Sequence, residues 1–323
     1  MALVFVHQGD SPYLEFTLRQ ARAAAPDDDL VLLGDPSNDH FPFLRHVDTT
    51  APAYEAAGAE IARVYRHLTT NGHTTALRWL QRWFWLRTFL RETGTARAVT
   101  LDSDVLLFAP EAELVAPLAD ARFAGGLPAD QSGYRWEVGP QVTVWPAATV
   151  EAFCDFALRS YTDPALGALY DEKWAYHVAH NLPGGVIDMT TLYLFVRDEI
   201  GIDAFVNLEA AREVGGERVA VDHNLSTAEN EVADEYAMDG GFKQLRWVDG
   251  RPVGRNVRLG ADVRFQALHL QGHAKARIPD FYRGPDFEGA AAVRRSLRAH
   301  FAARGVASRL LRPVRSLLSR LRG

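Results

Sequence analysis

The stretch Ala98-Val-Thr-Leu-Asp-Ser-Asp-Val-Leu-Leu-Phe108 places two carboxylates inside an apolar run. Its first part, Ala98–Leu101, is typical of a buried strand, and the chain becomes apolar again from Val105. Asp102 and Asp104 would repel each other at the end of that strand unless a cation joins them. Because carboxylate oxygens suit Mg²⁺ or Mn²⁺, the segment predicts a divalent metal site, with a turn or cap as the alternative.

The N-terminal residues predict the opening of a doubly wound α/β sheet. An apolar strand at Leu3–Val6 is followed by a loop, a helix over Pro12–Ala25 and a second strand at Leu30–Leu33. Ligands of such sheets sit beyond the carboxyl ends of the strands, where the loop after Val6 lies. This loop lacks the G-x-G-x-x-G pattern, so a dinucleotide of the Rossmann kind is not expected.

An aromatic helix is predicted over Thr75–Thr93, with Gly94 as its C-cap. Arg78 and Arg82 lie on or beside its apolar face, and a buried arginine there needs an anion, either a carboxylate or a phosphate. Four positions at helical spacing are expected in the core: Trp79, Trp83, Leu86 and Leu90.

Further elements follow along the chain. Gln141–Trp145 is expected to form a strand, and a helix is expected to start near Asp188, whose side chain either caps that helix or takes part in the site. Asp249-Gly250 is the preferred two-residue turn and predicts a hairpin, which makes the sheet mixed. The last predicted strand of the body, Val263–Leu268, leads into a second polar motif.

That motif is His269-Leu-Gln-Gly-His-Ala-Lys275. An imidazole at a strand end can complete an oxygen-rich metal site, Gly272 lets the backbone approach a ligand, and Lys275 supplies a point charge for phosphate. Together with the two aspartates, these residues describe a metal-diphosphate site, which is how an enzyme makes a nucleoside diphosphate a leaving group.

The Leu-Asp-Ser-Asp-Val of residues 101–105 and the H-x-x-G-x-x-K of residues 269–275 together resemble GT-A glycosyltransferases. Within that class they resemble the glycogenin-like family 8, which includes bacterial lipopolysaccharide galactosyl- and glucosyltransferases. The resemblance spans residues 2 to 285. It implies an α/β, Rossmann-like nucleotide-diphospho-sugar transferase fold with a mixed sheet flanked by helices.

The resemblance also implies roles for residues at matching positions. Asp102 is expected to contact both ribose and metal, Asp104 to be the main metal ligand and His269 the third. Gly272 and Lys275 are expected to hold the diphosphate. The other positions expected around the donor are His7, Gln8 and Tyr13 at the base, Ser103 between the aspartates, Arg78 or Arg82 near the phosphates or sugar, and Asp188 and Gln141 as catalytic candidates near the sugar.

The implied reaction is metal-dependent transfer of a hexose from a UDP-sugar to a hydroxyl acceptor, with Mn²⁺ or Mg²⁺ and with retention. Inversion would need a carboxylate base, for which Asp188 and Asp130 are the candidates. The alternatives are a metal-dependent hydrolase of nucleotide sugars or phosphates and a non-catalytic GT-A-like scaffold. A nucleotidyltransferase is disfavoured, because residues 7–12 hold one glycine and no arginine.

Charge is unevenly distributed in the 323 residues, whose formal net charge is −6. Residues 289–323 contain nine arginines and no acid, so we expect a glycosyltransferase domain over 1–288 and a basic amphipathic C-terminal helical tail over 289–323. The tail suits an anionic membrane surface, with a packed or a disordered tail as alternatives. The acidic body argues against nucleic-acid binding.

The expected location is the cytoplasm, with peripheral contact to the inner face of the membrane as an option, because the first residues lack the features of a signal peptide. The single cysteine, Cys154, lies in an apolar helical pattern and is expected to be a packed thiol. A glycan or glycolipid is the expected acceptor. Five aromatic residues suit sugar stacking or the core: Tyr134, Trp136, Tyr170, Trp174 and Tyr176.

Overall fold

The structure is a computed structural model that describes residues 1–115, 118, 122–126 and 132–301. Within these residues the main sheet has seven strands in the order β3-β2-β1-β4-β7-β6-β8. Strands β3, β2, β1 and β4 run parallel, and β7 runs antiparallel to β4. The bounds are β1 Ala2–Val6, β2 Leu30–Gly34, β3 Arg45–Asp48, β4 Arg97–Leu101, β6 Ala124–Gly126, β7 Gly139–Pro146 and β8 Val206–Asn207.

The central strands are apolar at nearly every position because both faces of the main sheet are covered. Leu3 and Phe5 of β1 belong to one buried cluster, while Ala2 and Val4 belong to the other. Such continuous apolar runs are typical of parallel strands covered on both faces. The predicted α/β fold with a mixed sheet between helices is therefore confirmed.

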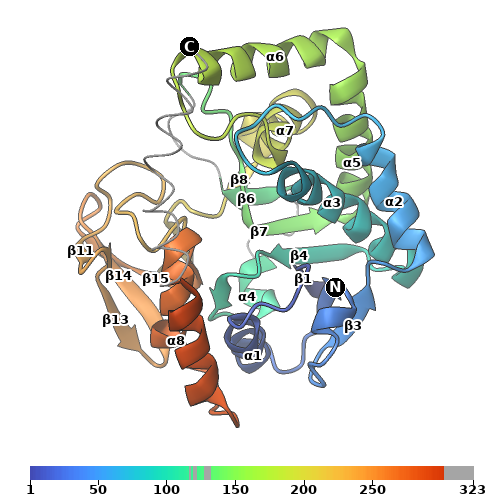
Figure 1. Ribbon diagram of the computed structural model, residues 1–323. Coiled ribbons are helices and arrows are strands. Elements are labelled where there is room, and N and C mark those ends of the chain that lie inside the picture. Colours follow the sequence, from blue (N-terminus) through green and yellow to red (C-terminus); the bar gives the residue numbers. More distant parts are fainter. Residues whose placement is uncertain (116–117, 119–121, 127–131, 302–323) are drawn as a thin grey trace.

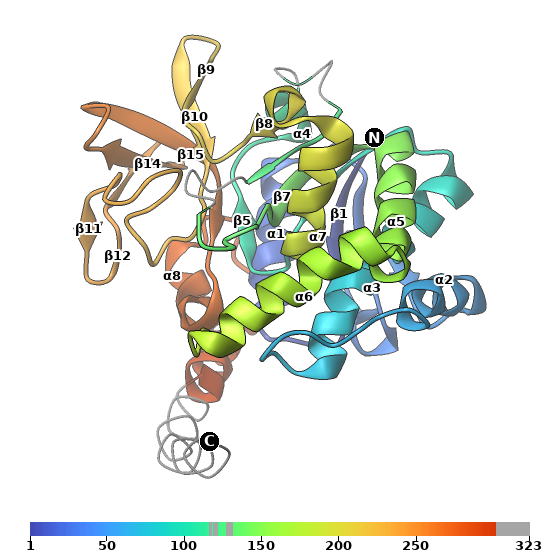
Figure 2. The ribbon, with the colours of Figure 1, turned by 90° about the horizontal axis from the view of Figure 1, so that it is seen from above.

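Helices cover the two faces of the main sheet unequally. Helices α2, α3, α5 and α7 pack on the face that carries Ala2 and Val4 of β1. Helix α1 and a second, smaller sheet pack on the face that carries Leu3 and Phe5 (Figures 1 and 2). The bounds are α1 Leu14–Ala24, α2 Pro52–Ala62, α3 His73–Thr93, α4 Glu111–Val115, α5 Ala147–Thr162, α6 Pro164–Ala179, α7 Asp188–Phe195 and α8 Ile278–Phe281.

The second sheet is built largely from the C-terminal half of the described chain, in the order β13-β14-β15-β10-β9, with β5 paired to β15. The predicted hairpin is present, and Asp249 and Gly250 at its turn both have positive φ. However, the hairpin belongs to this second sheet, so the main sheet is mixed because of β7 instead. The bounds are β5 Val105–Leu107, β9 Arg212–Val214, β10 Glu217–Val221, β13 Leu245–Val248, β14 Arg251–Asn256 and β15 Ala261–His269; a separate short pair is β11 Met238–Asp239 with β12 Phe242–Lys243.

The core predictions for α3 hold at three of four positions. Trp83, Leu86 and Leu90 are buried, whereas Trp79 is half-buried and lines a cavity. The predicted packing of Cys154 is confirmed, because its thiol is buried and burial raises its pKa.

Residues 290–301, at the start of the predicted tail, form a helix that packs against the body. Leu297 is fully buried, and Arg294 donates to the carbonyl of Pro279. The rest of the predicted tail, residues 302–323, lies outside the described residues. Among the described helices, none combines the length and the apolar character that crossing a bilayer requires.

Candidate active site

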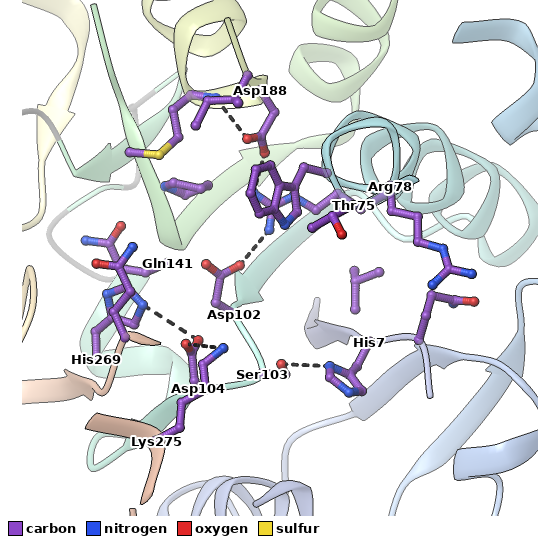
Figure 3. Close-up of a pocket in the computed structure, with 18 of the residues that line it drawn as sticks. His7, Thr75, Arg78, Asp102, Ser103, Asp104, Gln141, Asp188, His269 and Lys275 are labelled. Carbon is purple, nitrogen blue, oxygen red and sulfur yellow. Dashed lines mark hydrogen bonds and ion pairs between the residues drawn. The ribbon is translucent and has the colours of Figure 1, made fainter. Parts of the chain in front are cut away.

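A cavity of about 460 Å³ lies at the carboxyl ends of β1, β4, β10 and β15 (Figure 3). Of the predicted site residues that the structure describes, Gly272 alone is absent from its walls. The others that line it are His7, Gln8, Tyr13, Arg78, Arg82, Asp102, Ser103, Asp104, Gln141, Asp188, His269 and Lys275.

Sheet register explains why two motifs about 165 residues apart meet. The Asp-Ser-Asp segment forms a tight turn that carries the chain from β4 into β5, and Val105 of β5 pairs with His269 of β15. The carbonyl of Asp104 also accepts a hydrogen bond from Leu270. The last residue of β15 is thereby fixed beside the second aspartate.

Asp104 is surrounded by cations of the chain. Its Oδ1 lies 3.6 Å from His269 Nε2, and its Oδ2 lies 3.0 Å from Lys275 Nζ. Burial alone would raise the pKa of this carboxyl, but His269 and Lys275 outweigh burial and hold the pKa well below its ordinary value. Burial lowers the pKa of His269, yet Asp104 more than compensates and raises it to about 9. Asp104 is therefore charged at neutral pH.

Gly272 acts through the backbone. It starts the short helical turn Gly272–Arg277 with a φ of +59°, a conformation that a residue with a Cβ rarely adopts. This turn brings Lys275 back to Asp104 and over the ring of Tyr13.

Arg82 joins the first aspartate to Asp188. Its Nη1 lies 2.6 Å from Asp102 Oδ1, and its Nη2 lies 2.5 Å from Asp188 Oδ2. Burial raises the pKa of Asp188, although the pairing with Arg82 opposes it. Asp188 is the first residue of α7, and Ile187 is the N-cap, so Asp188 faces the arginine instead of capping the helix.

The loop of residues 7–13 is joined to the Asp102-Ser103-Asp104 turn through Ser103. The Ser103 hydroxyl lies 2.9 Å from His7 Nδ1 and 3.3 Å from the hydroxyl of Tyr13. Burial, followed by the charge of Lys275, lowers the pKa of His7 to about 4. His7 is thus a neutral hydrogen-bonding group at neutral pH, and it cannot serve as a cation for phosphate.

Side chains missed by the sequence analysis hold this loop in place. Asn38 donates to the carbonyls of His7 and Gly9, and Asp35 accepts from the amide of Gly9. Gln8 donates from Nε2 to the hydroxyl of Thr49 at 2.7 Å.

Two further residues of α3 line the cavity beside the predicted Arg78 and Arg82. Thr75 was not predicted, and Trp79 was assigned to the core. The four side chains share one face of α3 at helical spacing, so this face is part of the cavity wall and not of the core. His223 also lines the cavity, and its pKa is raised by Glu209 despite burial. The signal for His223 was the same as for Asp102, namely polar residues directly after an apolar strand.

The aromatic residues predicted to suit sugar stacking or the core differ in burial. Tyr170 is fully buried, which makes it a core residue. Tyr134, Trp136 and Tyr176 are partly exposed, and the ring of Tyr134 lies 4.9 Å from that of Trp136 and 5.0 Å from that of Tyr176. Trp174 is half-buried. Asp130, the alternative base, lies outside the described residues.

The donor atoms suit one divalent cation. Asp102, Asp104 and His269 each offer a ligand atom, and these atoms lie within 4.8 Å of one another. Two carboxylates and an imidazole are a donor set that Mn²⁺ accepts readily and Mg²⁺ accepts less readily, because magnesium prefers oxygen alone.

No protein-family model matches the sequence, and no curated protein does. Among solved structures, the chain is similar to mouse xyloside xylosyltransferase 1 in its apo form, with 11% identity over 64% of this chain and 84% of that chain and a TM-score of 0.39. It is also similar to the galactosyltransferase LgtC in complex with donor and acceptor sugar analogs, with 16% identity over 50% of this chain and 66% of that chain and a TM-score of 0.34. A third similar structure is the apo bifunctional glycosyltransferase WbbM, with 11% identity over 72% of this chain and 41% of that chain and a TM-score of 0.39.

Proposed function

We propose that the protein is a metal-dependent glycosyltransferase that moves a hexose from a UDP-sugar to a hydroxyl acceptor. The observation that carries this proposal is the convergence of Asp102, Asp104, His269 and Lys275 on one cavity at the carboxyl ends of strands. A site with metal ligands and a lysine side by side suits a diphosphate, which needs its charge balanced on several oxygens.

Asp102, Asp104 and His269 would hold Mn²⁺ or Mg²⁺, which when bound supplies Lewis-acid stabilisation of the charge on a departing diphosphate. Lys275 contributes the second positive charge. Its ammonium group carries three donors and is paired with Asp104, so it can donate to a diphosphate oxygen with a short movement of a flexible side chain. Gly272 shapes the turn that presents it.

The nucleoside end of the donor would lie against residues 7–13. His7 is held neutral, Tyr13 offers a ring, and Gln8 is tied to Thr49, so this wall can form hydrogen bonds and stack without adding charge. Asp102 lies between this wall and Arg82, where it can accept from a ribose hydroxyl.

The sugar would lie between the metal ligands and α7. Asp188 and Gln141 line this part of the cavity, where each can accept from a sugar hydroxyl. Asp188 is a poor general base, because each of its carboxylate oxygens already has a protein partner. Arg82 pairs with one oxygen, and the other accepts a hydrogen bond from the amide of Met189. This engagement favours retention, in which the leaving phosphate takes the acceptor proton.

The acceptor would be a glycan or glycolipid, for which Tyr134, Trp136 and Tyr176 offer partly exposed rings. The nine arginines after residue 288 suit an anionic membrane at which a glycolipid acceptor would be found. The protein would then act at the cytoplasmic face of that membrane.

Thermal unfolding with a panel of nucleotides tests the donor class. UDP, GDP, dTDP, ADP and CMP are each added with Mn²⁺, with Mg²⁺ or with EDTA, because a ligand of the native state raises its stability. We expect UDP with Mn²⁺ to raise the Tm and EDTA to abolish the rise. A panel with no metal-dependent shift would contradict the proposal. Release of UDP that is as fast without an acceptor as with one would favour a hydrolase.

A further inference from the structure

Glu209 lies after β8, and its side chain is completely buried behind the cavity wall. Its Oε1 accepts a hydrogen bond from Gln141 Nε2 and another, at 2.9 Å, from His223 Nδ1. The other oxygen, Oε2, is buried and has no hydrogen-bond partner among the described residues. A buried carboxylate with half of its capacity unused is costly to stability, so a role beyond packing is indicated.

Two glycines make room for this carboxylate. A Cβ atom at Gly126 would overlap Oε1 of Glu209, and a Cβ atom at Gly139 would overlap the carboxamide oxygen of Gln141. Neither glycine has a positive φ, so a Cβ atom at either position would be limited by these side-chain ends and not by backbone conformation. The strands β6 and β7 are thus shaped around the pair of Glu209 and Gln141.

The carboxylate fixes the orientation of both neighbours. Because a carboxylate only accepts hydrogen bonds, the amide group of Gln141 must turn its NH₂ toward Glu209 and its oxygen away. The same rule places a proton on Nδ1 of His223 and turns Nε2 away from Glu209. Gln141 and His223 both line the cavity, so each group that Glu209 orients belongs to the wall of the site.

Hydrogen bonds also connect Glu209 and His223 to His269, one of the proposed metal ligands. The backbone carbonyl of His223 lies 2.7 Å from His269 Nδ1, an arrangement that leaves His269 Nε2 facing Asp104. Asn230 donates to the backbone carbonyl of Glu209 and accepts from the amide of His223, which ties the two residues together.

We propose that Glu209 is a positioning residue for glycosyl transfer, which orients Gln141 and His223 toward the sugar. This inference rests on the proposed function. A negative charge behind the amide polarises it, so the oxygen of Gln141 becomes a better partner for the positive charge that a sugar ring develops as its bond to the diphosphate breaks. Glu209 itself does not line the cavity, so it would act through Gln141 and His223.

The test is a set of variants assayed for UDP release from UDP-glucose and UDP-galactose and for UDP binding with Mn²⁺. Glu209→Gln is expected to lower kcat about 10- to 100-fold, the range for residues that orient site groups. Its Kd for UDP with Mn²⁺ should stay within about threefold of wild type, because the binding groups keep their contacts. Glu235→Gln is the matched control, since Glu235 is also buried and bonded to Asn256 but lies off the cavity; it should leave kcat unchanged.

A double-mutant cycle separates positioning from general structural support. Added to Gln141→Ala/His223→Ala, the Glu209→Gln change should lower kcat less than about threefold further, because residues that act as a unit are not additive. If Glu209→Gln does not fold, Gly126→Ala displaces the same carboxylate and should lower kcat in the same way. A full additional loss in the cycle, or a Glu209→Gln variant as active as Glu235→Gln, would overturn the inference. Wild-type protein that binds no UDP with Mn²⁺ would instead overturn the proposed function, and the inference with it.

Discussion

Asp104 and Asp222 both lie at strand ends and both pair with a lysine, but only Asp104 faces the cavity. Lys243 is fully buried and donates to Asp222 Oδ1 at 2.5 Å, while Asp222 Oδ2 accepts from the amide of His269. Two backbone carbonyls and the side-chain oxygen of Asn230 also lie within hydrogen-bond distance of Lys243 Nζ. The three N–H donors of Lys243 are thus all used within the protein, and each oxygen of Asp222 has a protein partner.

The cavity-facing pair is less complete. Lys275 is about one quarter exposed, and the described hydrogen bonds and ion pairs give its ammonium one partner, Asp104. The same residue types thus serve two purposes: a buried pair whose lysine donors are all used fixes the chain, whereas a pair with spare donors beside a cavity can exchange partners with a ligand. Asp222 also supports the site, because it holds the backbone at His269.

The largest effect is expected from breaking the buried pair. Lys243→Met leaves the charge of Asp222 buried without its cation, and the free energy of unfolding should fall by about 3–5 kcal/mol. Urea unfolding followed by circular dichroism measures this. A loss below about 1 kcal/mol would mean that the Lys243–Asp222 pair does not stabilise the fold more than the Lys275–Asp104 pair does.

A third lysine, Lys173, is also buried, but among the described ion pairs its carboxylate partner is distant, with Glu137 Oε1 at 3.9 Å. Burial, only partly opposed by Glu137, lowers its pKa from 10.5 to about 8. Between these values the unfolded chain binds a proton that the folded chain has released, so this lysine makes stability rise with pH, by on the order of 3 kcal/mol at most. The measurement is urea unfolding at pH 7.5 and 10, compared with Lys173→Met. Equal pH dependence in both proteins would contradict a lowered pKa.

Breaking the cavity-facing pair should affect chemistry more than stability. Lys275→Met is expected to lower kcat/KM for the UDP-sugar about 100-fold, because the departing diphosphate loses one positive charge. The Tm should change by only a few degrees, since Asp104 keeps His269 and access to water. Steady-state UDP release and thermal unfolding check both parts. A variant that unfolds as readily as Lys243→Met would show that Lys275 is structural.

The smallest loss of stability is expected from breaking an exposed ion pair. Arg246 lies 2.7 Å from Asp262, and both side chains are about half exposed, so Arg246→Met should change the free energy of unfolding by less than about 1 kcal/mol. Urea unfolding of this variant alongside Lys243→Met gives the scale. A loss near that of the buried pair would show that exposure does not separate the two classes.

Much of the site could be predicted because its residues follow apolar strands. Asp102, Asp104 and His269 stand directly at strand ends, and this local pattern is visible in the sequence. The change of sheet between β4 and β5 was not predictable, because an apolar strand does not reveal which partner it pairs with. That pairing is what brings His269 to Asp104.

Residues 222–236 hold part of what the sequence did not reveal. His223 follows an apolar strand, as Asp102 does, but it lies with Asn230 in an irregular segment without periodicity, so the sequence pattern does not show that both residues contact the region of Glu209. Trp79 was misassigned to the core for a related reason. Helical spacing predicts which side chains share a face, but not whether that face meets a helix or a cavity.

The proposed function requires Asp104 to bind a metal through which a nucleoside diphosphate is held. Isothermal titration of UDP into wild type and Asp104→Asn, each with Mn²⁺ and with EDTA, measures this requirement. We expect Mn²⁺-dependent binding by the wild type, and at least about a 100-fold weaker Kd for the variant in Mn²⁺, equal to its Kd in EDTA. Equal affinity of the two proteins for UDP in Mn²⁺ would show that Asp104 does not hold the metal.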